Sequence, residues 1–229
     1  MKKISGIIAF ILAMTFVLCS CGNTTFTTSS DSDTTAPAGN VADDIISYDD
    51  DVQKAEDAEA STDEHPQVKF TMENGGSFVM ELYPEYAPKT VENFVELVSD
   101  GFYDGLTFHR VVDDFMAQGG CPEGTGMGGS SMKIKGEFEL NHFEQNTLSH
   151  TRGVVSMARS SSYNSASSQF FIMYSDNHTY LDGQYAAFGK VIQGMEVVDS
   201  FLEVERTVGN DGAISKPVEP IVIEKAEVL

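Results

Sequence analysis

Apolar and polar residues alternate with a period of two along much of the chain after residue 66. The runs Val68 to Met72 and Ser77 to Tyr83 flank Asn74-Gly75-Gly76, which predicts two strands joined by a tight turn. Similar short runs predict six further strands: Leu106–Val112, Phe115–Gln118, Val154–Ala158, Gln169–Tyr174, Ala187–Val191 and Pro220–Val228.

Two segments have helical spacing instead. Pro88 is placed to open a helix, because the amide N–H that proline lacks has no intrahelical partner at that position. Val91, Phe94, Val95 and Val98 then form one apolar face of this helix. Gly101 ends the helix. Met195 to Phe201 predicts a second helix. Many short strands with two helices favour a mainly β fold, a closed antiparallel β-barrel capped by the helices.

The first twenty residues have the layout of a secretory signal peptide. Lys2 and Lys3 precede an almost unbroken apolar run, Ile4 to Val17, which is short for a membrane span. Leu18-Cys19-Ser20-Cys21 then resembles a bacterial lipobox, which implies removal of residues 1–20 and lipidation of Cys21. An ordinary signal peptide cleaved nearby, or an uncleaved anchor, remains the alternative; each places the rest of the chain outside the cytoplasm.

Residues 21–65 differ sharply in composition from the rest of the chain. This segment is rich in Thr, Ser, Asp and Glu, has few large apolar residues, and Lys54 is its lone basic residue. Such a segment buries too little apolar surface to offset the entropy of ordering, so we expect a disordered tether between the membrane anchor and a domain over 66–229. An acidic recognition tail is the alternative function.

Charge and cysteine content narrow the function classes. The formal net charge of -21 disfavours nucleic acid and anionic membrane surfaces as partners. Cys121 is the single thiol of the domain, which leaves no disulfide, and it comes after Gly119-Gly120 in a predicted loop with no assigned role. The histidines lack zinc-like spacing. Nothing in the sequence requires more than a monomer.

Three co-linear blocks share their order, spacing and content with one family. They are Phe108–Val112 with Phe115–Gly120, Gly153–Arg159 with Ser168–Ile172, and Tyr180–Tyr185 with Phe188–Val191. From about Val68 to Leu229 the chain resembles the cyclophilin family. The resemblance implies an eight-stranded antiparallel β-barrel with a helix at each end. It also implies peptidyl-prolyl cis-trans isomerase activity without a metal or organic cofactor.

The resemblance also implies a set of site residues. Arg110 corresponds to the catalytic arginine, and Gln118 stands beside it as a second catalytic group. The substrate-binding positions are Phe115, Met116, Ala158, Arg159, Gln169, Phe171, Tyr180, Leu181 and Tyr185. Many eukaryotic members have Asn at Arg159, Trp at Tyr180 and His at Tyr185, so the chain resembles bacterial members more closely. The residue at Tyr180 weakens the expectation of tight cyclosporin binding.

These residue types suit rotation about an X–Pro bond, which makes and breaks no covalent bond and needs no nucleophile. A fixed guanidinium can stabilise the twisted amide, and an apolar pocket can hold the proline ring. Taken alone, Phe115, Met116 and Phe171 are equally compatible with a core, and Arg110 with a solvated strand face. The expected function is isomerisation of proline-containing polypeptides that fold outside the cytoplasm. A non-catalytic proline-binding module on the same fold, or a solute-binding lipoprotein, is the alternative.

Overall fold

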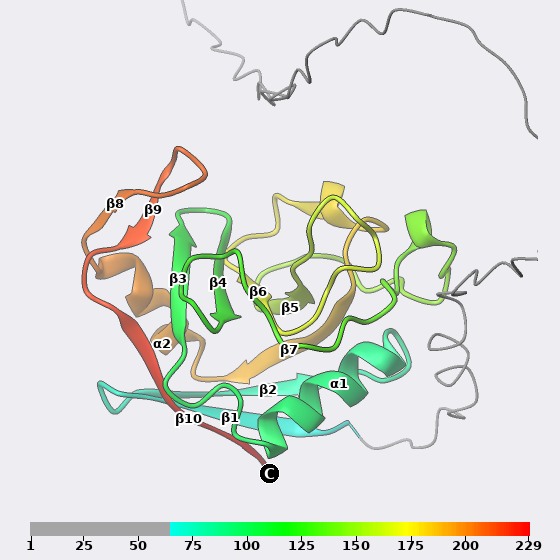
Figure 1. Ribbon diagram of the computed structural model, residues 1–229, viewed down its shortest axis with the longest axis horizontal. Coiled ribbons are helices and arrows are strands. Elements are labelled where there is room, and N and C mark those ends of the chain that lie inside the picture. The colour runs from blue at the N-terminus through cyan, green and yellow to red at the C-terminus, as the bar shows by residue number, and fades with distance from the viewer. Residues whose placement is uncertain (1–64) are drawn as a thin grey trace, which may run out of the picture. The chain divides into compact units, whose positions relative to one another are not determined.

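The computed structural model describes residues 65–229, and eight of its strands close an antiparallel barrel (Figure 1). The barrel strands are β1 (Gln67–Met72), β2 (Ser77–Leu82), β3 (Thr107–Val112), β4 (Met116–Cys121), β5 (Val154–Met157), β6 (Phe170–Met173), β7 (Ala187–Gln193) and β10 (Ile221–Val228). The predicted signal peptide, Cys21 and almost all of the predicted tether lie outside the described residues. The predicted fold class is confirmed.

The barrel closes between strands that are far apart in sequence. Around the barrel the order is β1-β10-β3-β4-β6-β5-β7-β2, and β2 returns to β1 through the hairpin predicted at Asn74-Gly75-Gly76. Val68 of β1 therefore pairs with Met80 of β2 on one side and with Val228 of β10 on the other. Every barrel strand has two neighbours, so the barrel leaves no open edge.

The barrel interior is filled mainly by aromatic side chains. Phe70 and Phe78 from the first hairpin stack with ring centroids 5.2 Å apart, and Phe170 of β6 packs against Phe70 at 5.7 Å. The helix α1 (Pro88–Ser99) adds Phe94, whose ring lies 5.3 Å from that of Phe170. These side chains have at most 1% of their surface exposed, so the stability of the domain rests on this core.

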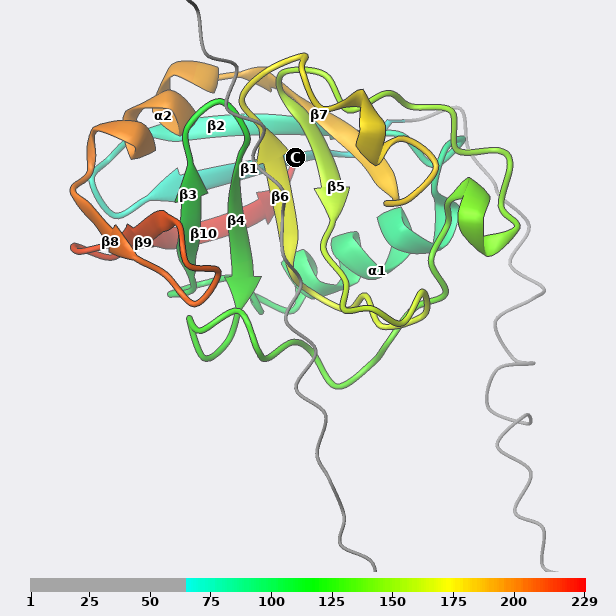
Figure 2. The ribbon, with the colours of Figure 1, turned by 90° about the horizontal axis from the view of Figure 1, so that it is seen from above.

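Helices α1 and α2 (Met195–Ser200) lie at opposite ends of the barrel (Figures 1 and 2). The N-terminus of α1 has no capping side chain of its own, because Ala87 precedes Pro88. A buried carboxylate, Glu137, supplies the cap from a distant loop. It accepts hydrogen bonds from the Lys89 N–H at 2.9 Å, the Thr90 N–H at 2.8 Å and the Thr90 hydroxyl at 2.7 Å. The Glu137 side chain thus caps α1 and at the same time attaches its own loop to that helix.

Strands β5 and β6 are buried on both faces, and this determines where the site lies. Phe170 and Ile172 of β6 point into the barrel core, whereas Phe171 and Met173 join a second, smaller apolar cluster with Met116. The period-two alternation of a strand produces this division. Because the second cluster packs outside the barrel core, its apolar side chains form the floor of a cavity on the barrel surface.

Two features differ from the sequence-based expectations. A separate hairpin, β8 (Arg206–Val208) and β9 (Ile214–Pro217), lies beside β3 (Figure 1), where the hydrophobic pattern predicted no element. Cys121 is not in a loop: it is the last residue of β4 and only 1% exposed. Its thiol sulfur accepts a hydrogen bond from the Gly126 N–H at 3.2 Å, so the next loop folds over it. Its oxidation would require this loop to open.

In the part of the chain that the structure describes, no helix is long and apolar enough to cross a membrane. The longest helix there is α1, with 12 residues.

Candidate active site

A cavity of about 240 Å³ opens on the outer face of the barrel above the second apolar cluster. Its lining combines an apolar floor with polar groups at the rim. The nine lining residues are Arg110, Phe115, Met116, Gln118, Ala158, Arg159, Phe171, Leu181 and Tyr185. The volume is below the ~300–1,000 Å³ typical of clefts for drug-sized ligands, and it suits a single ring. The floor is rigid, since Met116, Phe171 and Leu181 are at most 7% exposed.

Arg110 projects from β3 and is held on two sides. Its Nε–H donates to Asp211 Oδ2 at 2.7 Å, and Nη1 lies 3.5 Å from Gln118 Oε1 and 3.7 Å from Met116 Sδ. The guanidinium carbon is 5.7 Å from the centre of the Phe115 ring. Nη2 has no hydrogen-bond partner among residues 65–229. The side chain is 30% exposed, so this edge remains able to donate to a bound molecule.

A chain of amides continues from Arg110 along the cavity. Gln118 Nε2 donates to Gln169 Oε1 at 2.8 Å, and Gln169 Nε2 donates to the carbonyls of Gly126 at 3.0 Å and Gly128 at 2.6 Å. This directional chain leaves Gln118 Oε1 facing Arg110, because Nε2 of the same amide donates to Gln169 on the other side. The glycine-rich loop therefore fixes the orientation of Gln118.

Arg159 occupies the opposite rim of the cavity inside a group of aromatic rings. Its guanidinium carbon lies 4.6 Å from the ring centre of Tyr185 and 5.0 Å from those of Phe138 and Tyr163. Nε and Nη2 both donate to the Gln184 carbonyl, at 3.0 and 2.9 Å. Carbonyl and π contacts of this kind hold the cation in place, and no carboxylate of the described part of the chain pairs with it.

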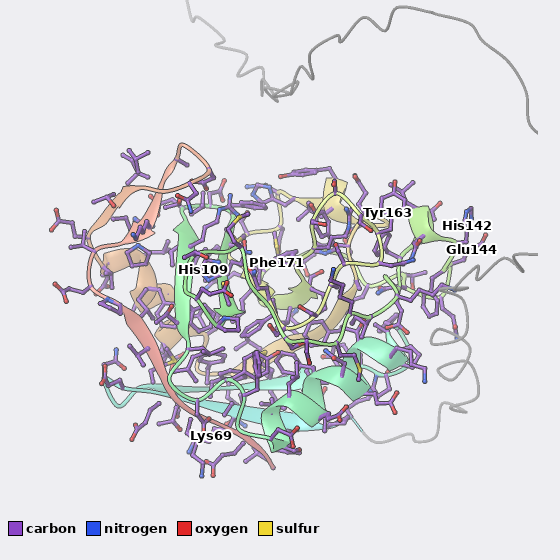
Figure 3. All side chains as sticks on the ribbon, viewed as in Figure 1. Lys69, His109, His142, Glu144, Tyr163 and Phe171 are labelled. Atoms are coloured by element: carbon purple, nitrogen blue, oxygen red, sulfur yellow. The ribbon has the colours of Figure 1, made fainter. Side chains whose placement is uncertain are left out.

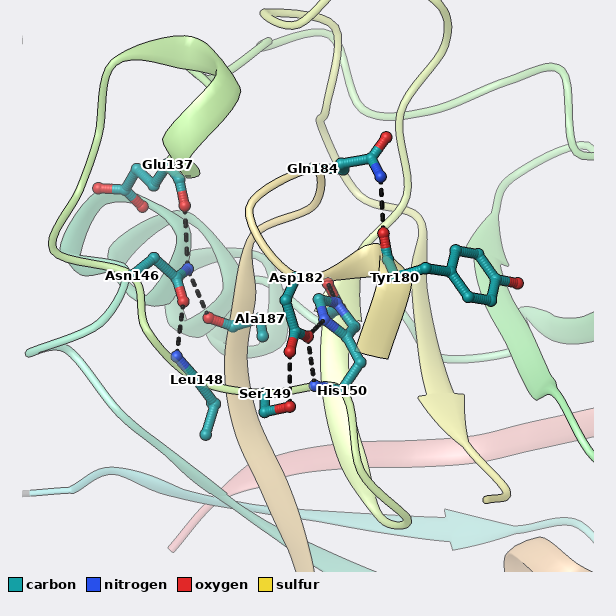
Figure 4. A network of polar contacts seen from close by, with 10 residues as sticks. Glu137, Asn146, Leu148, Ser149, His150, Tyr180, Asp182, Gln184 and Ala187 are labelled. Carbon is teal, nitrogen blue, oxygen red and sulfur yellow. Dashed lines mark hydrogen bonds and ion pairs between the residues drawn. The ribbon is translucent and has the colours of Figure 1, made fainter. Parts of the chain in front are cut away.

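A polar network around the buried His150 lies next to Phe171 of the cavity floor, and Figure 4 shows its contacts with Asp182. His150 Nδ1 lies 2.7 Å from Asp182 Oδ1, and His150 Nε2 lies 3.0 Å from Ser156 Oγ. Burial lowers the pKa of His150, against the pull of Asp182, so a neutral ring donates to Asp182 and accepts from Ser156. The contacts run from Asp182 through His150 to Ser156, as in a hydrolytic triad. However, Ser156 and His150 are fully buried and unable to reach a substrate. The ring instead stacks behind Phe171, 6.0 Å away.

Gln169 and Tyr180 are the predicted site residues that do not line the cavity. Gln169 acts one step behind it through Gln118, as described above. Tyr180 is 60% exposed in the short 3₁₀ turn Thr179–Leu181, and its hydroxyl lies 3.2 Å from His178 Nδ1. Sequence reasoning missed Asp211, which lies in an unpredicted hairpin. No local pattern marks this aspartate, because its partner Arg110 is 101 residues away.

His109 is a further residue beside the site whose environment the sequence did not reveal (Figure 3). The register between β3 and β4 slips at this position, and neither ring nitrogen has a hydrogen-bond partner within residues 65–229. The ring packs against Gly126, where an added Cβ would come within 3.3 Å of Nε2. Burial, with the adjacent Arg110 cation, lowers the pKa of His109 from 6.5 to about 4.

This lowered pKa predicts an acid-sensitive fold. The unfolded chain takes up a proton on His109 near pH 6.5 and the folded chain only near pH 4, so stability is lost as pH falls across this range. We expect His109 to account for a loss of about 2–3 kcal/mol in the free energy of unfolding. Urea titrations of His109→Phe between pH 7 and 4 should show a shallower decline than wild type. His142→Asn, which removes an exposed imidazole, should decline as wild type does; an equal slope in all three proteins would contradict the prediction.

The cyclophilin type peptidyl-prolyl cis-trans isomerase/CLD family model matches residues 67–228, which spans all eight barrel strands and every cavity residue. The chain belongs to the cyclophilin family. Peptidyl-prolyl cis-trans isomerase B of Bacillus subtilis is 47% identical over 127 residues, covering 56% of this cyclophilin and 84% of that protein. Peptidyl-prolyl cis-trans isomerase ppi1 of Schizosaccharomyces pombe is 43% identical over 155 residues, covering 67% and 94%.

Solved structures agree with these relatives. A Cryptosporidium parvum cyclophilin type peptidyl-prolyl cis-trans isomerase, crystallised in the presence of the dipeptide Ala-Pro, superposes with a TM-score of 0.60 at 32% identity. The match covers 71% of this cyclophilin and 98% of that chain. Family membership, together with relatives named for the activity, makes this cyclophilin a peptidyl-prolyl cis-trans isomerase.

Proposed function

We propose that this enzyme binds proline-containing polypeptides outside the cytoplasm and rotates their X–Pro bonds at the Arg110 cavity. The observation that carries the site assignment is the free edge of the Arg110 guanidinium at the mouth of a rigid apolar cavity. The related Cryptosporidium protein was crystallised in the presence of the dipeptide Ala-Pro, which supports a proline-containing peptide as the ligand.

Rotation about an X–Pro bond is opposed by amide resonance, with a barrier of about 18–20 kcal/mol. In the twisted transition state the proline nitrogen regains a localised lone pair, which the planar ground states lack. A donor aimed at that nitrogen therefore stabilises the transition state more than either ground state, and only such a difference accelerates the reaction. In our proposal Nη2 of Arg110 is this donor, and the cation remains charged throughout because arginine does not deprotonate in proteins.

The apolar floor performs the complementary task of holding the proline ring still. Phe171, Met116 and Leu181 form a buried surface, and none of them can move without disturbing the second apolar cluster to which all three belong. Phe115 covers the side of the cavity toward Arg110. With the ring held in place, the residue before proline and its carbonyl are the parts that turn. Gln118 is placed to form hydrogen bonds with the carbonyl that turns. Ala158 and Arg159 line the cavity where the substrate backbone would lie.

The proposed location rests on the sequence before the domain. A signal-like apolar run ends at Leu18-Cys19-Ser20-Cys21, and an acidic segment separates Cys21 from the barrel. Acyl chains on Cys21 would anchor the enzyme through burial of CH₂ groups, each contributing about 0.8 kcal/mol. The clients would then be exported polypeptides whose folding waits on slow X–Pro exchange, which takes tens to hundreds of seconds without catalysis.

A fatty-acid labelling experiment tests the location. In cells producing the full chain, we expect a labelled fatty acid to appear on the protein and the protein to sediment with membranes. Cys21→Ala should abolish the label and, because residues 1–20 then stay attached, give a protein that migrates more slowly on a gel, whereas Cys19→Ala should keep the label and the mobility of wild type. Label persisting in Cys21→Ala, or a wild-type protein found only in the soluble cytoplasmic fraction, would contradict the proposed anchor while leaving the isomerase activity intact.

A further inference from the structure

The hairpin β8–β9 lies outside the barrel, yet it reaches the active-site arginine. Its strand β9 packs against β3, the strand that carries Arg110 (Figures 1 and 2). Two contacts fix it to the elements around the cavity. Arg206 at its base pairs with Asp113 after β3 at 2.7 Å, and Asn210 in its turn donates to the Thr125 carbonyl of the glycine-rich loop at 3.3 Å.

The turn of this hairpin orients one carboxylate. Asp211 Oδ1 accepts hydrogen bonds from the Ser215 hydroxyl at 2.7 Å and from the Ala213 N–H at 3.1 Å. These bonds leave Oδ2 to accept from Arg110 Nε at 2.7 Å, in a charge-assisted contact between side chains only 25% and 30% exposed. Burial of the Asp211 carboxyl raises its pKa, but the hydrogen bonds from Arg110, Ser215 and Ala213 outweigh this and hold the pKa below its usual value.

The contact has a geometric consequence for the guanidinium. A guanidinium is planar, so fixing Nε at Asp211 and placing Nη1 beside Gln118 determines the direction of Nη2. Without Asp211, the side chain could rotate about its last bonds, since the remaining contacts to Gln118 and Met116 are long, at 3.5 and 3.7 Å. Catalysis by a fixed donor depends on such orientation being established before the substrate arrives.

We propose that Asp211 is a positioning residue that holds the Arg110 guanidinium with its Nη2 edge toward the bound X–Pro bond. The proposal rests on the proposed role of Arg110. It assigns a function to the β8–β9 hairpin, which is to present one carboxylate to a residue on the barrel surface. The alternative consequence of the same contact is inhibition, in which Asp211 draws the cation away from the substrate; the two make opposite predictions for removal of the carboxylate.

The test compares steady-state kinetics of the full chain and its variants on a chromogenic X–Pro tetrapeptide. We expect Asp211→Ala to lower kcat about 10-fold with KM changed less than 2-fold, since one charge-assisted hydrogen bond acting in the transition state is lost. Asp211→Asn keeps an acceptor oxygen and should recover most of kcat. Asp199→Ala, the matched control, removes a carboxylate that pairs with Arg152 at 2.7 Å away from the cavity, and it should leave kcat unchanged.

Two further measurements separate positioning from a purely structural role. In an Arg110→Ala background, Asp211→Ala should cause no additional loss of kcat, because the two residues act as one unit. In ¹⁵N NMR spectra, the Arg110 Nε–H resonance should be protected from solvent exchange in wild type and lose that protection in Asp211→Ala.

Four results would overturn the proposal: equal losses in the wild-type and Arg110→Ala backgrounds, a loss in Asp199→Ala as large as that in Asp211→Ala, a rise in kcat when Asp211 is removed, or a kcat that its removal leaves unaffected. An inactive wild type would instead refute the proposed function itself. An active wild type with an unaffected Asp211→Ala variant refutes only the role of Asp211.

Discussion

Arg110→Ala is expected to lower kcat/KM for X–Pro isomerisation by roughly 100-fold or more, the size of loss seen when a preorganised transition-state donor is removed. The guanidinium of Arg110 lines the cavity, and its Nη2 has no hydrogen-bond partner among residues 65–229. Because the side chain is 30% exposed and contributes nothing to the barrel core, the variant should stay folded. Exchange spectroscopy on an X–Pro peptide, with a thermal melt of the same sample, measures both quantities.

Two companion variants make this result specific. Arg110→Lys keeps the charge but not the planar fork, so its activity should lie between those of wild type and Arg110→Ala. Arg152→Ala removes another arginine that is paired with an aspartate, Asp199 at 2.7 Å, away from the cavity, and should keep wild-type kcat/KM. A folded Arg110→Ala protein with wild-type kcat/KM would remove Arg110 from the mechanism and leave the apolar cavity to act alone.

Glu137→Ala should produce the largest loss of stability among polar substitutions in this domain, about 3 kcal/mol. The carboxylate is 3% exposed and satisfies three donors at the start of α1. Each buried donor left without an acceptor costs about 1–3 kcal/mol, and the helix also loses an anion at the positive end of its dipole. For a domain of this size the loss corresponds to a fall in Tm of roughly 6–12 °C.

The control for this prediction lies seven residues further along the chain. Glu144 is exposed, so Glu144→Ala should change Tm by little (Figure 3). Glu137→Gln keeps one acceptor oxygen and should cost less than Glu137→Ala. Urea unfolding followed by circular dichroism gives all three values. A loss below about 1 kcal/mol for Glu137→Ala would show that water replaces the carboxylate at the helix terminus.

The sequence predicted those strands and helices that depend on the spacing of apolar residues within the segment itself. The run Phe170-Phe171-Ile172-Met173 is apolar at every position and was predicted as a strand, and both of its faces are covered. The apolar spacing of Val91, Phe94 and Val98 likewise matched the buried face of α1. The same patterns could not show that Phe171 belongs to a cavity floor and Phe170 to the core; the resemblance to a family supplied that distinction.

The features that the sequence did not reveal depend on contacts between distant segments. Glu137 caps a helix 47 residues earlier, and Asp211 meets Arg110 across 101 residues. Neither carboxylate differs locally from the many acidic residues of this chain. Cys121 was expected in a loop because two glycines precede it, but Gly119 and Gly120 both lie within β4. A side chain does not fit at Gly120, where a Cβ would lie 2.5 Å from the Ser168 carbonyl oxygen.

The position of β10 between β1 and β3 has a consequence for when the domain can fold. Val68, among the first residues of the barrel, has Val228 as one of its two pairing partners, so the ring of strands stays open until nearly the whole domain has been synthesised. Pairings this far apart in sequence slow folding, since a long loop must close before they contribute any stability. A chain stalled in synthesis before Ile221 therefore lacks a closed barrel, and we expect protease to digest it more readily than the complete domain.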